Sequence, residues 1–268
     1  MEVWNWLKES YLNTETDDRT KDYLIVKYEW SMYLIFAGYL YFVLRCGPRY
    51  MQDKEPWSCK TFIKYYNIFQ IIYNYWIVHS CIKYGLFTDF GLGCVFVDRS
   101  PVGRPMELVN VYYWTLVLKM IDLVETGVFV LRKKQRQISF LHLYHHISTI
   151  YIAQMSVRYF PGGMATVPIV VNSSIHVVMY TYYLLSSQGP SVQKIINPFK
   201  PYITIMQMVQ FFFLLGHTLQ AFMPYCHVPK WGAVVMVFNL FMNFILFYNF
   251  YRQNYKAPTK AKVEGKKN

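Results

Sequence analysis

Long apolar runs fill most of this chain of 268 residues, and they constrain its fold more than any other feature of the sequence. The hydrocarbon core of a membrane is about 30 Å thick, so a helix needs about 20 mainly apolar residues to cross it. Charged residues make up only 16% of the chain, whereas a typical soluble domain contains about 25%. Because so few polar side chains cannot cover a soluble globule, the sequence predicts one helical domain inside a membrane.

Seven of these runs have the length and composition of membrane-spanning helices, which predicts an all-α polytopic membrane protein with seven transmembrane helices. The first run is short, and the second contains polar residues such as Asn67, Gln70 and Asn74. Six spans, with the first run at the membrane surface, are therefore the alternative. The predicted spans are residues 30–44, 65–82, 108–131, 138–157, 166–185, 202–223 and 231–251.

The basic residues between the runs predict the orientation of the chain. With seven spans, one side of the membrane collects 17 Lys and Arg residues and the other collects 9. Basic loops favour the cytosol, so the basic tail 252–268 is predicted to be cytosolic and the tail 1–29 to lie on the opposite, lumenal side. Residues 30–251 then form the membrane domain. The net charge of +12 is spread between apolar runs rather than gathered on one solvated face, which argues against a nucleic-acid partner.

Two of the five cysteines, Cys94 and Cys226, lie on the lumenal side in this orientation. A lumen is oxidising, so a disulfide between them would persist there. The other reading is that all five cysteines are small buried or interfacial side chains. We predict the disulfide, because it would tie together two loops at one end of the bundle.

The third predicted span contains three ionisable residues, which are costly inside a membrane unless they are paired or functional. Lys119, Asp122 and Glu125 fall on one side of a helix, together with Thr126. An ion pair between Lys119 and Asp122 that merely lets the helix insert would explain two of the three charges. Glu125 would still need a partner from another part of the chain.

The fourth predicted span begins with three histidines on one face. His142, His145 and His146 lie within about 100° of one another on a helical wheel, near the cytosolic boundary. Clustered imidazoles can bind a transition metal or act as acid, base or nucleophile near neutral pH. Membrane di-iron desaturases and hydroxylases use the same H-x-x-H-H spacing. Of the seven histidines, His227 and His79 lie at or near the lumenal side, and the remaining five include no second H-x-x-H-H and no H-x-x-x-H box. Five histidines are too few ligands for the usual histidine-rich di-iron site, so no metal is predicted.

Two further spans carry polar stripes. In the fifth, Asn172, His176, Tyr180 and Tyr183 lie on one face of the helix. Polar residues in membrane bundles often only hydrogen-bond one helix to another, which is the alternative for each residue taken singly. The presence of Asn172 one turn from His176 favours a functional site instead. The sixth span presents Thr204, Gln207, Gln210 and His217 on one broad side.

At these residues the chain resembles the ELO family of very-long-chain fatty acid elongases, over nearly its whole length. Residues 137–146 (QISFLHLYHH) are similar to the family's histidine box with its upstream flank. Residues 172–183 (NSSIHVVMYTYY) match the N-x-x-x-H-x-x-M-Y-x-Y-Y block, and residues 204–210 (TIMQMVQ) match T-x-x-Q-x-x-Q. The family's K-x-x-E-x-x-D-T block departs from its pattern here, because Asp122 and Glu125 exchange the two acids.

The resemblance implies a fold and an activity. Members of the family condense a long-chain acyl-CoA with malonyl-CoA, which yields CO2, CoA and a 3-oxoacyl-CoA two carbons longer. The implied fold has seven helices in the endoplasmic reticulum membrane, six of which enclose a tunnel for the acyl chain. No cofactor is implied beyond the two substrates. The other implied partners are the lipid bilayer, a second copy of the chain, and the ketoacyl-CoA reductase, dehydratase and enoyl reductase of the elongation cycle.

Soluble condensing enzymes hold the acyl group on a cysteine, but no cysteine accompanies this histidine box. The resemblance implies that His145 carries the acyl group instead, with His176 facing it. The other implied catalytic residues would orient protons and stabilise the enolate that forms when malonyl-CoA loses CO2; they are His142, His146, Asn172, Asp122 and Glu125. The implied substrate-binding residues are Lys119, Gln207, Gln210, Tyr180 and Tyr183.

Two other classes of function stay open from the sequence. A histidine-box di-iron oxidoreductase, such as a desaturase or hydroxylase, would bind iron. A transporter without enzymatic activity would have a pathway open at both faces of the membrane and would form no covalent adduct with acyl-CoA.

Overall fold

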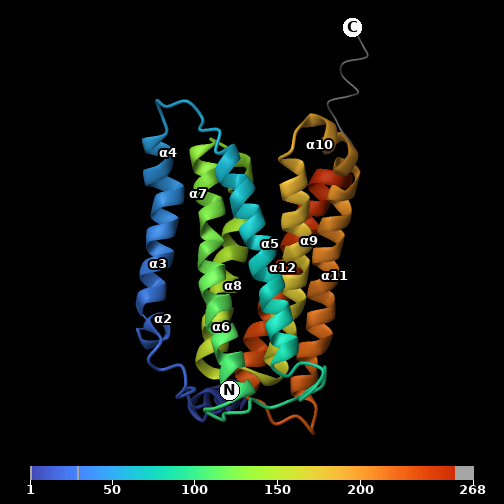
Figure 1. Cartoon of the computed structure of the whole chain (residues 1–268). Coiled ribbons are helices and arrows are strands. Elements are labelled where there is room, and N and C mark those ends of the chain that lie inside the picture. The colour runs from blue at the N-terminus through green and yellow to red at the C-terminus, as the bar shows by residue number, and fades with distance from the viewer. Residues whose placement is uncertain (1, 29, 257–268) are drawn as a thin grey trace.

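The computed structural model describes residues 2–28 and 30–256 (Figure 1). Within these residues the secondary structure is helical and contains no β-strand, apart from an isolated bridge between Leu86 and Phe90. The predicted all-α fold is therefore confirmed. Most of the tail predicted at 252–268 lies outside the described residues.

Each predicted apolar run coincides with one helix or with helices joined end to end. Of the helices in the described part of the chain, three are long and apolar enough to cross a membrane: Gly163–Ser186, Pro190–Phe222 and Lys230–Lys256. The bundle consists of α3 (Trp30–Tyr41), η1 (Phe42–Cys46), α4 (Gly47–Tyr50), α5 (Lys60–Lys83), α6 (Arg104–Ile121), α7 (Leu123–Leu131), α8 (Phe140–Tyr159), α9 (Thr166–Ser186), α11 (Lys200–Leu219) and α12 (Lys230–Tyr251). Shorter segments are α1 (Glu2–Leu12), α2 (Leu24–Lys27), η2 (Gln135–Gln137), η3 (Gly163–Ala165), α10 (Pro190–Ile196), η4 (Asn197–Phe199), η5 (Gln220–Phe222) and η6 (Arg252–Lys256).

Helix ends differ from the predicted runs for local reasons. Helix α8 begins at Phe140 because the Ser139 hydroxyl accepts a hydrogen bond from the backbone N–H of His142 (3.2 Å), which caps the first turn. The first helix continues past its predicted end at residue 44, through the π-helical turn η1 and into α4. Pro48 has no N–H and its ring would clash with the carbonyl four residues before it, so the backbone widens there.

The helices run side by side along one axis, and the first of them stands at the edge of the bundle (Figure 1). Helix α4 packs against α7, whereas α5 packs against α9, α6 against α8, and α11 against α12. The third predicted span is two joined helices, α6 and α7, which meet at Asp122. The ionisable residues of that span therefore lie across a helix junction rather than on one unbroken helix.

One end of the bundle, which we call the N-terminal end, is covered by α1 and by the loops around residues 84–103 and 223–229 (Figure 1). The indole of Trp231 donates a hydrogen bond to the Thr14 hydroxyl (2.9 Å), which fastens the N-terminal segment to α12. The two loops are joined by a disulfide between Cys94 and Cys226, whose Cα atoms lie 5.8 Å apart.

Candidate active site

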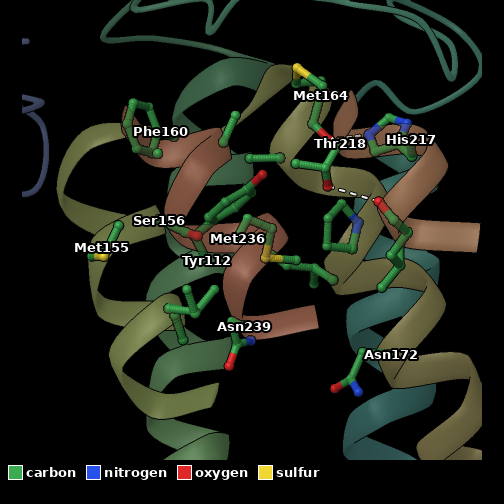
Figure 2. Close-up of a pocket in the computed structure, with 18 of the residues that line it drawn as sticks. Tyr112, Met155, Ser156, Phe160, Met164, Asn172, His217, Thr218, Met236 and Asn239 are labelled. Atoms are coloured by element: carbon green, nitrogen blue, oxygen red, sulfur yellow. Dashed lines mark hydrogen bonds between the residues drawn. The ribbon is translucent and has the colours of Figure 1, made fainter. Parts of the chain in front are cut away.

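A cavity of about 310 Å³ lies among α6, α8, α9, α11 and α12, and its volume falls in the range of small-molecule sites. Its deeper part is lined by polar residues, including Lys119, His145 and Asn172. The wall at the N-terminal end is built from loop residues such as Phe96 and from Phe160. Figure 2 shows this end, with Phe160, Met164 and His217 near the loops and Asn172 further into the bundle.

Of the three box histidines, His145 is the one that lines the cavity. Its Nδ1 lies 3.1 Å from Oδ1 of Asn243 on α12. Asn243 is only 1% exposed and lines the same cavity. A polar side chain of a second helix thus fixes the orientation of the His145 ring through Nδ1.

His142 and His146 have different surroundings. Nε2 of His142 lies 2.8 Å from the Thr126 hydroxyl, which in turn lies 2.9 Å from the hydroxyl of Tyr39 on the first helix. His146 is buried, with its ring centroid 4.3 Å from that of His142. The three imidazoles are therefore neighbours, as their spacing predicted, but His142 faces α7 and the edge helix instead of the cavity.

A buried ionic cluster lies beside the cavity. Nζ of Lys119 is 3.3 Å from Oδ2 of Asp122 and 3.5 Å from Nδ1 of His176. The other carboxylate oxygen of Asp122 accepts a hydrogen bond from the Gln70 amide (2.7 Å). The predicted Lys119–Asp122 pair is thus formed, and it also positions His176. Within the described residues the side-chain carboxylate of Glu125 has no ion pair and no hydrogen bond, and only its backbone N–H donates, to the carbonyl of Asp122 (3.2 Å).

The remaining predicted residues divide between the cavity and its surroundings. His176 and Tyr180 are both buried, with ring centroids 5.7 Å apart, whereas Tyr183 is 37% exposed. The Gln207 amide contacts the sulfur of Met179 at 3.4 Å and does not line the cavity. Gln210 does line the cavity, is 5% exposed, and its Oε1 has no hydrogen-bond partner in the described part of the chain. A buried polar atom without a partner is rare in proteins and marks a place where a ligand could bind.

Some site residues were not identified from the sequence. Asn239 and Asn243 lie four residues apart on α12, and Gln70 and Asn74 have the same spacing on α5. All four are buried, and each pair is joined by hydrogen bonds between successive turns. Two polar residues four positions apart inside an apolar run lie on one face of a helix. This sequence pattern could have identified the four residues as part of a site.

The wall at the N-terminal end is held by several fixed contacts. Arg19 forms an ion pair with Asp17 (2.7 Å) and donates to the backbone carbonyl of Asp98 (2.8 Å). The backbone N–H of Ser100 donates to the Asp98 carboxylate (2.9 Å), which lowers the pKa of that carboxyl. These contacts and the Cys94–Cys226 disulfide keep the loop that contains Phe96 closed over the cavity.

The described ionisable side chains near the cavity do not form a metal site. Across residues 2–28 and 30–256, no group of three or more His, Cys, Asp or Glu side chains converges in a way that could hold a metal ion. None of the described residues that line the cavity is a cysteine.

Comparison with known proteins places the chain among lipid enzymes. Residues 24–263 match the model of the ELO family, described as the GNS1/SUR4 family. The chain is 32% identical over 260 residues to very long chain fatty acid elongase 4 of Mus musculus, which covers 97% of this chain and 80% of the relative. It is 36% identical over 256 residues to very long chain fatty acid elongase F of Drosophila melanogaster, covering 91% and 96%. The similarity therefore extends over nearly the whole chain.

Proposed function

This chain belongs to the ELO (GNS1/SUR4) family, and from that premise we propose that it is a very-long-chain 3-oxoacyl-CoA synthase. In the proposed reaction it condenses a long-chain acyl-CoA with malonyl-CoA and releases CO2, CoA and a 3-oxoacyl-CoA two carbons longer. No electron is transferred to an outside acceptor, so the reaction needs no redox cofactor.

The proposal depends mainly on one observation. One cavity is lined by His145, by the ammonium of Lys119 and by Gln210, whose Oε1 has no hydrogen-bond partner in the described part of the chain, and it extends to an apolar wall at Phe160. A polar end and an apolar end suit an acyl thioester, whose head is polar and whose tail is hydrocarbon. His145 is the nucleophilic side chain that can reach a thioester there.

The chemistry follows in two steps. Nε2 of His145 attacks the thioester carbonyl, so that an N–C bond forms, the C–S bond breaks and CoA leaves as a thiolate that takes up a proton. Malonyl-CoA then loses CO2, and the resulting enolate attacks the acyl carbon, which forms the C–C bond and frees the imidazole. We assign His176 to the face opposite His145.

The remaining polar groups stabilise charge in this scheme. The enolate and the oxyanions carry negative charge that hydrogen-bond donors near the cavity would stabilise. We assign this task to the NH2 groups of Asn172 and Gln210 and to the ammonium of Lys119. His142, His146, Asp122 and Glu125 orient protons or hold the other groups in place, and Gln207, Tyr180 and Tyr183 contribute to the substrate site.

The membrane arrangement is part of the proposal. We propose seven spans in the endoplasmic reticulum membrane, six of them around the acyl chain, with residues 1–29 lumenal and 252–268 cytosolic. The disulfide of Cys94 with Cys226 would then close the lumenal end, and mass mapping without reductant would detect it. The reductases and dehydratase that complete an elongation cycle would be partners, as would a second copy of the chain.

An elongation assay in membranes tests the proposal. Purified protein given acyl-CoA alone should gain the mass of one acyl group, and the further addition of malonyl-CoA should release the elongated product. His145→Ala should form no adduct and should lose activity by at least about a thousandfold, about 4 kcal/mol in the barrier. His79→Ala, on an exposed histidine of α5, is the matched control and should behave like wild type.

Other outcomes would favour the other functions. Full activity in His145→Ala would contradict the proposed chemistry. Stoichiometric iron or zinc whose removal stops turnover would indicate a metal oxidoreductase. Movement of substrate across a sealed vesicle without any adduct would indicate a transporter.

A further inference from the structure

The amide of Asn243 is held in one orientation by the preceding turn of α12. Its nitrogen donates to the backbone carbonyl of Asn239 (2.9 Å) and to Oδ1 of Asn239 (3.0 Å). A backbone carbonyl can only accept a hydrogen bond, so the group that faces it must be the NH2. The atom of Asn243 that contacts Nδ1 of His145 is therefore Oδ1, at 3.1 Å.

This orientation determines which nitrogen of His145 carries a proton. An amide oxygen only accepts, so the contact requires the proton on Nδ1 of the imidazole. In a neutral imidazole the other nitrogen then holds a lone pair. The free lone pair of His145 is thus on Nε2, and the residue lines the cavity in which a substrate would bind.

His176 is held in the other neutral tautomer, with its proton on Nε2. An ammonium group can only donate, and Nζ of Lys119 lies 3.5 Å from Nδ1 of His176, at the long end of hydrogen bonding. That nitrogen must therefore accept, which leaves the proton of neutral His176 on Nε2. One imidazole offers a lone pair and the other offers an N–H, because their partners have opposite hydrogen-bonding character.

We propose that Asn243 is a positioning residue that keeps the proton of His145 on Nδ1 and thereby makes Nε2 the nucleophile. This inference rests on the proposed function, in which His145 carries the acyl group. When Nε2 attacks the thioester carbonyl, the ring becomes an acylimidazolium that retains its Nδ1 proton. The departing thiolate takes up the single proton that the net reaction consumes.

The Asn243 oxygen also stabilises the intermediate. After the attack it accepts a hydrogen bond from a positively charged ring, and such bonds are about twice as strong as those between neutral groups. When the enolate carbon attacks, the electrons of the N–C bond return to Nε2 and the original neutral form is restored. Asn243 therefore acts in both steps through its hydrogen bond with the ring of His145.

The first test reads the protonation state directly. Nitrogen NMR of protein with ¹⁵N-labelled histidine separates the two neutral forms, and the signal of His145 is identified by its loss in His145→Ala. We expect the proton on Nδ1 in the wild type. A proton on Nε2 would overturn the inference, whether or not an acyl adduct forms.

The second test measures the rate of adduct formation from acyl-CoA alone in a single turnover. Asn243→Leu should slow it by at least about a hundredfold, since a catalytic histidine held in the wrong form loses more than that. Asn243→Asp retains an acceptor for Nδ1–H but loses the two bonds that Asn243 donates to Asn239, so its rate should fall between those of the wild type and Asn243→Leu. The control is Asn110→Leu, which removes a similar bond from the Tyr23 hydroxyl (2.7 Å) at the N-terminal end and should leave the rate unchanged.

The outcomes separate this inference from the proposed function. Lack of any adduct on the wild type would contradict the role of His145 itself. A normal adduct on the wild type, with a wild-type rate in Asn243→Leu, would overturn only the role of Asn243. If Asn243→Leu does not fold, the NMR measurement on the wild type and the Asn243→Asp rate still decide the question.

Discussion

The two ends of the cavity contain similar types of residue. They differ in whether the hydrogen-bonding groups of those residues are already paired within the protein or are free to bind a ligand. At the N-terminal end, His217 uses both ring nitrogens on protein, against the carbonyl of Met164 (3.0 Å) and the amide of Gln220 (3.2 Å). The Thr218 hydroxyl there donates to the carbonyl of Leu214 (2.8 Å). At the deep end, Gln210 and Asn172 have no such partners among the described residues.

This difference in hydrogen-bond pairing shows that the types of residue that line one end of the cavity do not by themselves make that end polar. A side chain whose donors and acceptors are all paired presents mainly carbon to the cavity, whereas an unpaired amide favours a polar ligand. The N-terminal end can thus hold a hydrocarbon tail although it contains a histidine, a threonine and Tyr112. Ser156 is an exception at that end, since its hydroxyl has no partner in the described residues (Figure 2).

The largest loss of activity is expected when the positive charge at the deep end is removed. Lys119→Met would leave the buried Asp122 unpaired, which typically costs about 3–5 kcal/mol of folding free energy. We expect elongation to fall by at least about a thousandfold, together with a lower unfolding temperature in detergent. Both activity and thermal unfolding should be measured.

A double variant separates the effect of the Lys119 charge on stability from its effect on activity. Lys119→Met with Asp122→Asn removes both charges, so it should recover much of the lost stability while activity stays low. Wild-type activity in the double variant would show that the pair only permits insertion of the helix, the alternative that the sequence left open.

A second prediction compares one side chain from each end. Gln210→Leu should lower kcat/KM by about 10–100-fold, which is about 1.4–2.8 kcal/mol, because the amide is available to the substrate. It should not lower stability, since Oε1 has no hydrogen bond to lose. Thr218→Val is the matched variant at the N-terminal end and should leave kcat/KM within about twofold. Equal losses in the two variants would contradict the distinction between the ends.

The helices were predictable because span length and apolar composition follow from membrane thickness alone. Their ends were less predictable, since they depend on single contacts such as the Ser139 cap and on the effect of Pro48. Helical spacing also placed His142, His145 and His146 together correctly. It could not show that His142 faces Thr126 while His145 faces Asn243, because spacing along one helix contains no information about which neighbouring helix lies opposite.

A third prediction concerns the exchanged acids near the deep end. The double substitution Asp122→Glu and Glu125→Asp restores the family's order and keeps the total charge, so activity should stay within about tenfold, about 1.4 kcal/mol. The longer side chain at 122 must still reach Lys119 and the amide of Gln70. A thousandfold loss in the elongation assay would show that the site is built around the exchanged spacing.

The smallest effect on rate is expected at the N-terminal end, where substitutions should change product length instead. Phe160→Ala removes part of the wall and opens space, so we expect acceptance of acyl chains about one two-carbon unit longer, with the rate within about threefold. Gly232→Ala should act in the opposite sense, because its new Cβ would lie 2.8 Å from Cε2 of Phe160 and the ring would have to move. Chromatography of products from acyl-CoAs of graded length measures both. If neither variant changes the chain length of the product, the hydrocarbon tail does not reach this wall. The paired polar groups around the wall would then stabilise the N-terminal end of the bundle rather than bind the substrate.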